Sequence, residues 1–430
     1  MIAHVVSTQS NLADRLRLGD YITLERMRVY CLIIVTGYVA GLLWNSTGGI
    51  WPLDRHGQPL AKDLVPVYTA GMLVLQGAPE AVYDHSLHSA VQFAMFGAQI
   101  KFLAWCYPPS FLAVAAFLAH LPYGIAAIVW QATGLVAFLA VTQRILPGRL
   151  SLLAAAAFPA AFINVLYCQN GFITAALMTY GFLLLTTRPI VAGVLIGLLS
   201  YKPHLGLLIP IALVAGGYWR TIAASAVTVV VLVAATVAGF GLKTWIAFMA
   251  GLGPTRRIVI EEGRAYEGAV SEWDRIMSVF AAFRRIGFPA ELAYVPQGIA
   301  AIASIAVVVA LFYRKADHRL CVASVLVGSL LTTPYFLHYD MVIVGPAIAL
   351  LAAYGLERGF LHYEKSILAF AWVAPILAQP AAEFLNLPLG TVAVGLLQWM
   401  IAARVFPAIT SRRQSDPTWS GNAAQQHTPA

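Results

Sequence analysis

Residues 110–121 read SFLAVAAFLAHL, and their length settles the topology of the whole chain. The stretch is almost wholly apolar and lies between Pro109 and Pro122, but about twelve residues are too few to cross a hydrocarbon core about 30 Å thick. We therefore predict a juxtamembrane or re-entrant helix that turns back at Pro122. As a full span it would place Arg144 and Arg149 outside and move every later loop to the opposite side of the membrane.

The composition is that of a polytopic membrane protein. Sixty per cent of the 430 residues are hydrophobic and 11% are charged, against about 25% charged in soluble domains. The mean hydropathy of +0.76 excludes a soluble enzyme or a disordered chain. We predict one membrane domain over residues 1–410 and a disordered cytoplasmic tail over 411–430, which is rich in Ser, Gln, Asn, Pro and Thr. The net charge of +8 indicates membrane loops, not nucleic acid as a partner.

The apolar runs predict an all-α polytopic fold of about twelve transmembrane helices. The expected spans lie near 28–44, 123–143, 150–167, 170–187, 189–201, 204–218, 221–241, 295–313, 320–336, 339–355, 366–379 and 388–405. Residues 63–77 and 80–98 have apolar residues at helical spacing with polar ones between them, which predicts helices lying in the membrane interface.

The charges of the short loops predict which side each loop faces. The expected inward loops contain Arg188, Arg220, Arg314, Lys315, Arg319, Arg358 and Lys365, whereas the short outward loops contain little beyond Lys202. Under the positive-inside rule both termini are cytoplasmic, and residues 45–122 and 242–294 are external. The external loop 242–294 is itself basic, but long loops translocate largely regardless of charge. We expect a multi-pass protein of the plasma (inner) membrane with its active face outside.

Asp63 is the first candidate for chemistry on that external face. It begins an amphipathic stretch with Pro66 in the first turn, so it has the features of a helix N-cap. A carboxylate at the membrane edge is also a candidate general base. A capping carboxylate with one free oxygen can do both, so the two interpretations remain open.

Cations suited to a phosphate follow later in the chain. Lys202 and His204 interrupt two apolar runs; a lysine here either snorkels to the interface or stabilises a departing phosphate. In the loop 242–294 the arginines either pair with the loop's own acids or clamp a phosphate. Arg256 and Arg257 are favoured for the clamp because no acid lies immediately beside them.

Two further junctions are richer in polar residues than a span end requires. Residues 334–340 read PYFLHYD, which suits either an aromatic interfacial belt with a hydrogen-bonded His338 or a binding site. Gln169 and Asn170 are either interfacial amides or partners for sugar hydroxyls. The histidines lack metal-ligand spacing, and the sequence has no glycine-rich phosphate loop or nucleophile elbow. No metal and no other cofactor is expected.

Taken in order, these pieces resemble the GT-C superfamily of polyprenyl-phosphate-sugar-dependent glycosyltransferases, and within it glycosyltransferase family 87. The matching pieces are Asp63-Leu64-x-x-x-Tyr68-x-Ala70 with Gly77 and Tyr83-Asp84, Tyr107-Pro108-Pro109, Cys168-Gln169-Asn170, Lys202-Pro203 and Pro334–Asp340. The resemblance covers roughly residues 28–405 and implies a GT-C-like bundle. One departure is Cys168, where the family usually has glycine.

The resemblance implies transfer of a hexose, with mannose favoured, from a polyprenyl-phosphate-linked donor to a hydroxyl of a lipid or glycan acceptor, with inversion at the anomeric carbon. In that family an acidic residue of the first external loop is the candidate base, and Asp63 is the matching position. We assign the donor and its phosphate to Lys202, His204, Arg256, Arg257 and His338. We assign the sugar and the acceptor to Tyr68, Tyr107, Gln169, Asn170, Tyr339 and Asp340. The alternative is a transporter or flippase, in which polar residues usually lie near the midplane of the bilayer.

Overall fold

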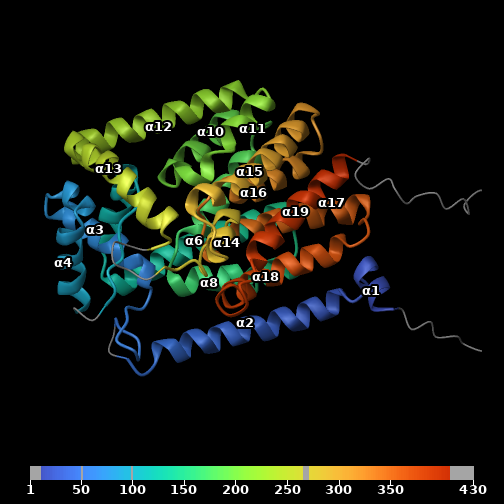
Figure 1. Cartoon of the computed structure of the whole chain (residues 1–430), viewed down its shortest axis with the longest axis horizontal. Coiled ribbons are helices and arrows are strands. Elements are labelled where there is room, and N and C mark those ends of the chain that lie inside the picture. The colour runs from blue at the N-terminus through green and yellow to red at the C-terminus, as the bar shows by residue number, and fades with distance from the viewer. Residues whose placement is uncertain (1–10, 50–51, 98–99, 265–270, 407–430) are drawn as a thin grey trace, which may run out of the picture.

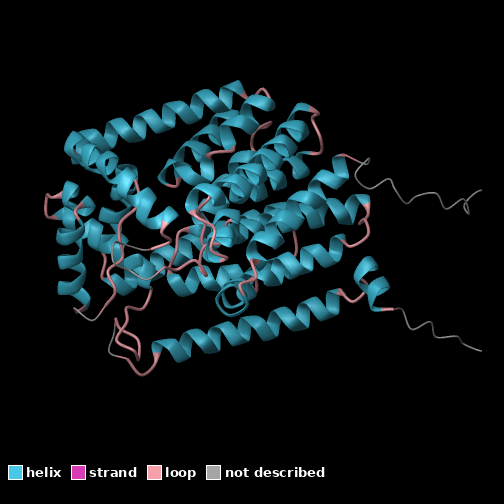
Figure 2. Ribbon diagram, in the orientation of Figure 1, coloured by secondary structure: helices cyan, strands magenta, loops and turns pink. Residues whose placement is uncertain are grey.

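The computed structural model describes residues 11–49, 52–97, 100–264 and 271–406. Within these ranges the chain consists of helices joined by loops, without strands (Figure 2). Two isolated antiparallel bridges join Leu53 with Pro59 and Ile276 with Leu337. The all-α fold predicted from the apolar runs is confirmed. The predicted tail, residues 411–430, lies outside the described residues.

The chain begins with the short helix α1 (Leu12–Leu18) and the long helix α2 (Leu24–Ser46), which lies along one edge of the molecule (Figure 1). Thr23 caps α2 by accepting a hydrogen bond from the backbone N–H of Arg26. Midway along α2, the Tyr38 ring stacks on the Phe162 ring with their centroids 4.1 Å apart. The rest of α2 is largely exposed, as expected of a helix whose surroundings are lipid.

The first expected external loop folds into short helices around a small core of its own. They are η1 (Lys62–Leu64), α3 (Val65–Leu75), η2 (Pro79–Tyr83), α4 (His85–Phe96), η3 (Pro109–Phe111) and α5 (Leu112–Ala119). The helices predicted for 63–77 and 80–98 are therefore present, and α5 has only 8 residues, as the length of 110–121 predicts. Gly71 lets α3 and α5 touch, because a Cβ there would come within 2.1 Å of the Ala115 carbonyl oxygen.

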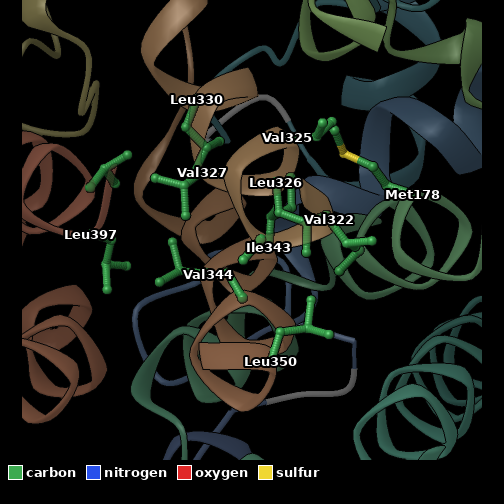
Figure 3. Close-up of a cluster of buried hydrophobic side chains, with 14 of the residues drawn as sticks. Met178, Val322, Val325, Leu326, Val327, Leu330, Ile343, Val344, Leu350 and Leu397 are labelled. Atoms are coloured by element: carbon green, nitrogen blue, oxygen red, sulfur yellow. The ribbon is translucent and has the colours of Figure 1, made fainter. Parts of the chain in front are cut away.

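The remaining helices form the main bundle. They are α6 (Tyr123–Ile145), α7 (Arg149–Ala156), α8 (Pro159–Tyr167), α9 (Gly171–Leu183), α10 (Pro189–Leu198), η4 (Leu199–Tyr201), η5 (Pro203–Gly206), α11 (Ile209–Ala215), α12 (Trp219–Phe240), α13 (Leu242–Thr255), the π-turn η6 (Arg256–Glu261), α14 (Val279–Arg285), α15 (Ala290–Tyr313), α16 (His318–Thr332), η7 (His338–Ile343), α17 (Val344–Arg358), α18 (Glu364–Leu385) and α19 (Leu389–Val405). Helix α16 lies at the centre, where Val322 and Leu326 pack against Ile343 and Met178 (Figure 3).

Every expected span coincides with a helix or a pair of helices, but not all of these helices are long enough to cross a membrane. Among the described residues, six helices are long and apolar enough to cross a membrane: α2, α6, α12, α15, the continuous stretch His338–Arg358, and α18. Helices α7 and α8, bent by 51°, make a seventh if they form one broken span. The other five expected positions hold apolar helices of 10–17 residues. The multi-pass character is thus supported, and the count of twelve remains a prediction.

The described beginning and end of the chain lie at the same end of the molecule. Helix α1 contacts the start of α18, where the Tyr21 hydroxyl lies 3.0 Å from that of Ser366. Arg404, near the end of α19, donates a hydrogen bond of 2.6 Å to Glu364 in the same region. Helices α3, α4 and α13 gather at the opposite end (Figure 1). That both termini face the cytoplasm remains a prediction.

The expected external loop 242–294 contains helices α13 and α14, and between them a segment that pairs with a distant part of the chain. Ile276 forms an antiparallel bridge with Leu337. The Met277 N–H donates to the Phe336 carbonyl at 2.9 Å, and the His338 N–H donates to the Arg275 carbonyl at 3.0 Å. This pairing fixes the Arg275 backbone beside the start of η7.

Candidate active site

Asp63 lies in the single turn η1 and does not cap a helix. Its Oδ2 accepts a hydrogen bond of 2.8 Å from Gln169 Nε2, and its Oδ1 receives no hydrogen bond from a described residue. Neither η1 nor α3 has a side-chain cap at its N-terminus. The N-cap interpretation of Asp63 is therefore wrong: the chain enters α3 through a 3₁₀ turn, so the carboxylate points toward Gln169 instead of the helix amides.

The backbone before Asp63 is held in an unusual conformation. Ala61 has φ 57° and ψ 44°, in the left-handed region that costs a non-glycine residue roughly 1–2 kcal/mol. The Tyr123 hydroxyl, at the start of α6, lies 2.8 Å from the Leu60 carbonyl oxygen and 2.9 Å from that of Ala61. Strain of this kind persists only where the surroundings enforce it, and here it orients η1 and its carboxylate.

The surroundings of Asp63 make it a stronger proton acceptor than a carboxylate on the protein surface. Burial raises the pKa of Asp63 above its usual range, whereas Arg275, the Gln169 hydrogen bond and Lys62 act in the opposite direction. A raised pKa makes the ionised carboxylate a stronger proton acceptor. Because both neighbouring cations favour the charged form, the carboxylate can still ionise.

The amides of Gln169 and Asn170 lie in the sharp turn between α8 and α9. Cys168 is the C-cap of helix α8, and its φ of 59° and ψ of 43° are left-handed, a conformation that glycine adopts readily. Asn170 Nδ2 donates to the Tyr107 hydroxyl at 2.8 Å, while its Oδ1 is buried without a hydrogen-bond partner among the described residues. The turn therefore brings Gln169 to Asp63 and Asn170 to Tyr107.

Lys202 and Asp340 form a buried salt bridge. Lys202 Nζ lies 2.7 Å from Asp340 Oδ1, and the two side chains are only 5% and 2% exposed. Asp340 Oδ2 also accepts a hydrogen bond of 3.0 Å from the Leu337 N–H, which closes the first turn of η7. Lys202 therefore neither snorkels to the interface nor stands unpaired before a phosphate. The expected free cation is instead part of the support for residues 337–340.

His338 and Tyr339 lie in the turn that the Asp340–Leu337 hydrogen bond closes. The His338 ring contacts those of Tyr167 and Tyr339, with centroids 4.9 and 5.4 Å away, and both of its nitrogens are buried without a hydrogen-bond partner among the described residues. A buried unsatisfied imidazole requires an explanation, and a bound ligand or water is one. His204 is only partly buried, and its ring lies 6.1 Å from that of Tyr335.

The reason for favouring Arg256 and Arg257 as a phosphate clamp was wrong. The two side chains are 65% and 78% exposed, and they pair with Glu261 at 3.0 Å and Glu262 at 3.1 Å. Each acid follows its arginine by five residues, the i→i+5 spacing of the π-helical segment η6. Acids five positions away are not adjacent in the sequence, so adjacency alone does not reveal these pairs. Both arginines thus follow the other interpretation, in which the loop's charges pair with each other.

Two cations that the sequence did not single out lie at the site instead. Lys62 Nζ is 4.3 Å from the centre of the Tyr167 ring, and Arg275 Cζ is 5.2 Å from the same ring. The Arg275 side chain is 17% exposed and pairs with Glu272 at 2.6 Å. Its Nε is buried without an acceptor among the described residues. Lys62 was detectable as the neighbour of Asp63, whereas no local pattern marks Arg275.

The tyrosines assigned to sugar and acceptor occupy three different positions. The Tyr68 hydroxyl donates to the Leu121 carbonyl at 2.7 Å, so it ties α3 to the turn that follows α5. Tyr107 meets Asn170, and Tyr339 is buried with its ring 5.7 Å from Lys202 Nζ. Within the described ranges, no three His, Cys, Asp or Glu side chains are grouped as a metal site would require.

Within the described part of the chain, the site therefore combines a carboxylate that has one oxygen without a hydrogen bond, two cations on one tyrosine ring, and buried polar atoms without partners. Such an arrangement can accept a proton and can stabilise an anion beside it.

Comparison with known proteins identifies a family of glycosyltransferases. The model of glycosyltransferase family 87 matches residues 105–337, more than half of the chain. The match is narrower than the resemblance over 28–405: it includes Gln169, Lys202 and Arg275, but Asp63 precedes it and His338 follows it. No curated protein and no solved structure matches the chain. On the family match, this protein belongs to glycosyltransferase family 87.

Proposed function

We propose that the protein transfers a hexosyl group, with mannosyl favoured, from a polyprenyl-phosphate-linked donor to a hydroxyl of a lipid or glycan at the external face of the plasma (inner) membrane. The observation that carries the proposal is the position of Asp63, which is oriented by Gln169 at 2.8 Å while Lys62 and Arg275 share the neighbouring Tyr167 ring. A base and a site for an anionic leaving group thus lie side by side.

In the proposed reaction Asp63 accepts the proton of the acceptor hydroxyl on its free oxygen. The acceptor oxygen bonds to the anomeric carbon while the bond from that carbon to the phosphate oxygen breaks, and the electron pair leaves with the polyprenyl phosphate. Attack from the face opposite the phosphate inverts the anomeric centre. The raised pKa of Asp63 supports this role, because proton transfer is most effective when the pKa of the base is near the working pH.

The leaving phosphate gains negative charge in the transition state, so it needs cations more than a proton donor. Arg275 and Lys62 are the cations beside Tyr167, and the His338 ring, whose nitrogens have no hydrogen-bond partner among the described residues, lies 4.9 Å from the same Tyr167 ring. We assign Lys202 a positioning role, since its salt bridge with Asp340 holds the turn that carries His338 and Tyr339. Asn170 Oδ1, buried without a partner among the described residues, is suited to a sugar hydroxyl.

Transport or lipid flipping is the rival function. A transporter usually places its polar groups near the midplane of the bilayer, on broken helices. Here Asp63, Gln169 and Asn170 form one connected cluster, and the chain belongs to a family of glycosyltransferases. Both observations favour transfer over transport.

The test is an assay of purified protein with radiolabelled polyprenyl-phosphate-mannose and a lipid extract as acceptor. We expect label to move from the donor into a product of the extract, with inverted anomeric configuration. Movement of intact donor across sealed vesicles without any transfer would favour the rival. A reporter fused after Arg149 tests the external placement separately, because it should behave as cytoplasmic.

A further inference from the structure

Two amide side chains hold the backbone of Gln169. Its N–H donates to the Asn164 carbonyl at 3.0 Å, and its carbonyl oxygen accepts from Gln131 Nε2 at 2.9 Å. The Asn164 amide, oriented to satisfy both neighbours, donates to the same Gln169 carbonyl at 2.8 Å and accepts from the Gly171 N–H at 3.2 Å. A carbonyl oxygen has two lone pairs, so both acceptor positions of Gln169 are filled. The turn that presents the Gln169 side chain to Asp63 is therefore fixed by α6 and α8.

Helix α6 packs closely enough on the start of α9 to deliver the Gln131 amide. At Gly134, three residues after Gln131, a Cβ would come within 3.0 Å of the Phe172 Cβ. At Gly171 a Cβ would come within 2.3 Å of the Asn164 amide, so the turn has room only for glycine. Helix α6 is long and apolar enough to span a membrane, and a polar side chain within such a helix is a candidate for function.

The same helix also holds the segment that leads to Asp63. Tyr123 is the first residue of α6, and its hydroxyl lies 2.8 Å from the Leu60 carbonyl oxygen and 2.9 Å from that of Ala61. The Tyr123 ring is buried, with its edge against the rings of Tyr68 and Phe96. Gln131 follows Tyr123 by eight residues, about two turns or 12 Å along the helix. One helix thus contacts the segments that carry both partners of the Asp63–Gln169 hydrogen bond.

We propose that Tyr123 and Gln131 are positioning residues, through which α6 holds Asp63 and Gln169 at hydrogen-bond distance. The inference rests on the proposed function for the role of Asp63 as the base. Packing of α6 requires neither a hydroxyl at position 123 nor an amide at position 131. Both groups instead donate to backbone carbonyls, one beside each partner of the bond. Loss of either contact lets one partner move, so the hydrogen bond between them is formed for less of the time.

Such a loss should raise the pKa of Asp63, because the hydrogen bond from Gln169 lowers it. Activity falls as pH drops through that pKa, so the acidic limb of the kcat/KM profile should move to higher pH. The charged groups that face Asp63 include Arg275, Lys62 and Glu272, and the variants below leave all three in place. Its other titratable neighbours include Tyr107, Tyr123, Tyr167, Cys168 and Tyr339.

The test compares the pH profiles of transfer by Tyr123→Phe, Gln131→Leu and Gln169→Leu. We expect each of the first two to shift the acidic limb upward by about half a pH unit or more, but no further than Gln169→Leu does. Combined with Gln169→Leu, either change should add no further shift, because α6 acts through the Gln169 side chain. Additive shifts, or an unmoved limb in either single variant, would overturn the proposal. Tyr123→Phe keeps the ring and its packing, and it decides the outcome alone if Gln131→Leu does not fold.

Gln398→Leu is the matched control, since Gln398 is a buried amide of α19 that donates to Ser304 Oγ at 3.3 Å. Its acidic limb should not move, and a shift equal to that of Gln131→Leu would overturn the proposal. Infrared titration of the Asp63 carboxyl, identified by its loss in Asp63→Asn, makes the same comparison without transfer. The expected shifts in a protein that transfers no sugar would retain the role of α6 and refute the proposed function. Transfer with an unshifted Asp63 in both α6 variants would refute the role of α6 alone.

Discussion

Gln169 Nε2 donates a hydrogen bond of 2.8 Å to Asp63 Oδ2, joining two residues that lie 106 positions apart. The bond holds the carboxylate away from the amides at the start of α3, and its other oxygen receives no hydrogen bond from any residue that the structure describes. It also stabilises the ionised form of Asp63, because the donor meets a charged oxygen.

Gln169→Leu should therefore move the pH dependence of transfer. Without the donor the carboxylate loses part of its stabilisation, so the pKa of Asp63 rises further. Activity is lost as pH falls through that pKa, since a protonated Asp63 cannot accept the acceptor's proton. We expect the acidic limb of the kcat/KM profile to shift to higher pH in the variant. An acidic limb unmoved in Gln169→Leu would contradict the coupling.

Arg275→Gln should reduce turnover by about 10²-fold, equivalent to about 2.7 kcal/mol of transition-state stabilisation, if its charge stabilises the leaving phosphate. Because Arg275 also lowers the pKa of Asp63, the comparison belongs at a pH where both proteins are on their plateau. Arg257→Gln is the matched control, as Arg257 is exposed and pairs with Glu262. Equal turnover in the two variants would remove Arg275 from the mechanism.

The salt bridge between Lys202 and Asp340 should control stability as well as activity. Lys202→Met leaves Asp340 as a buried unpaired charge, which typically costs 3–5 kcal/mol, about the range we expect from thermal unfolding in detergent. Adding Asp340→Asn removes that charge while an oxygen remains to accept from the Leu337 N–H. The double variant should recover most of the loss. No recovery would mean that Lys202 stabilises the fold through something other than Asp340.

Because the backbone at Cys168 is left-handed, we expect glycine at this position to give a more stable fold than alanine, the reverse of the usual effect of the two residues on stability. Elsewhere glycine is the less stable of the two by roughly 0.5–1 kcal/mol, but at φ 59° alanine keeps a strain that glycine relieves. We expect Cys168→Gly to unfold at a higher temperature than Cys168→Ala, although both lose the buried sulfur. The opposite order would show that the α8–α9 turn relaxes when the cysteine is removed.

The sequence predicted the helices well because each one is an apolar run with a clear boundary. The shortness of 110–121 and the helices of the first external loop follow from length and spacing alone. The number of membrane crossings does not, because helices such as α9, of 13 residues, are long enough to be recognised but short for a bilayer.

The sequence predicted those site residues that lie at the ends of apolar spans. It did not predict the residue that reaches the site through pairing of distant segments. Gln169, Asn170, Lys202 and Asp340 were singled out as polar residues at the ends of apolar runs. Arg275 was missed because a bridge between Ile276 and Leu337, 61 positions away, places it, and nothing local encodes that pairing. The capping interpretation of Asp63 was wrong because the 3₁₀ turn η1 precedes α3.

The most direct measurement is turnover by purified Asp63→Asn. Asparagine keeps the size and an oxygen that can accept from Gln169, and it removes a charge that burial disfavours. Stability should therefore be unchanged or slightly higher. Turnover should fall by about 10²-fold or more, and Asp63→Glu should restore little, since misplacing the oxygen by about 1 Å alone costs about 10²-fold. Wild-type turnover in Asp63→Asn would contradict the assignment of Asp63 as the base.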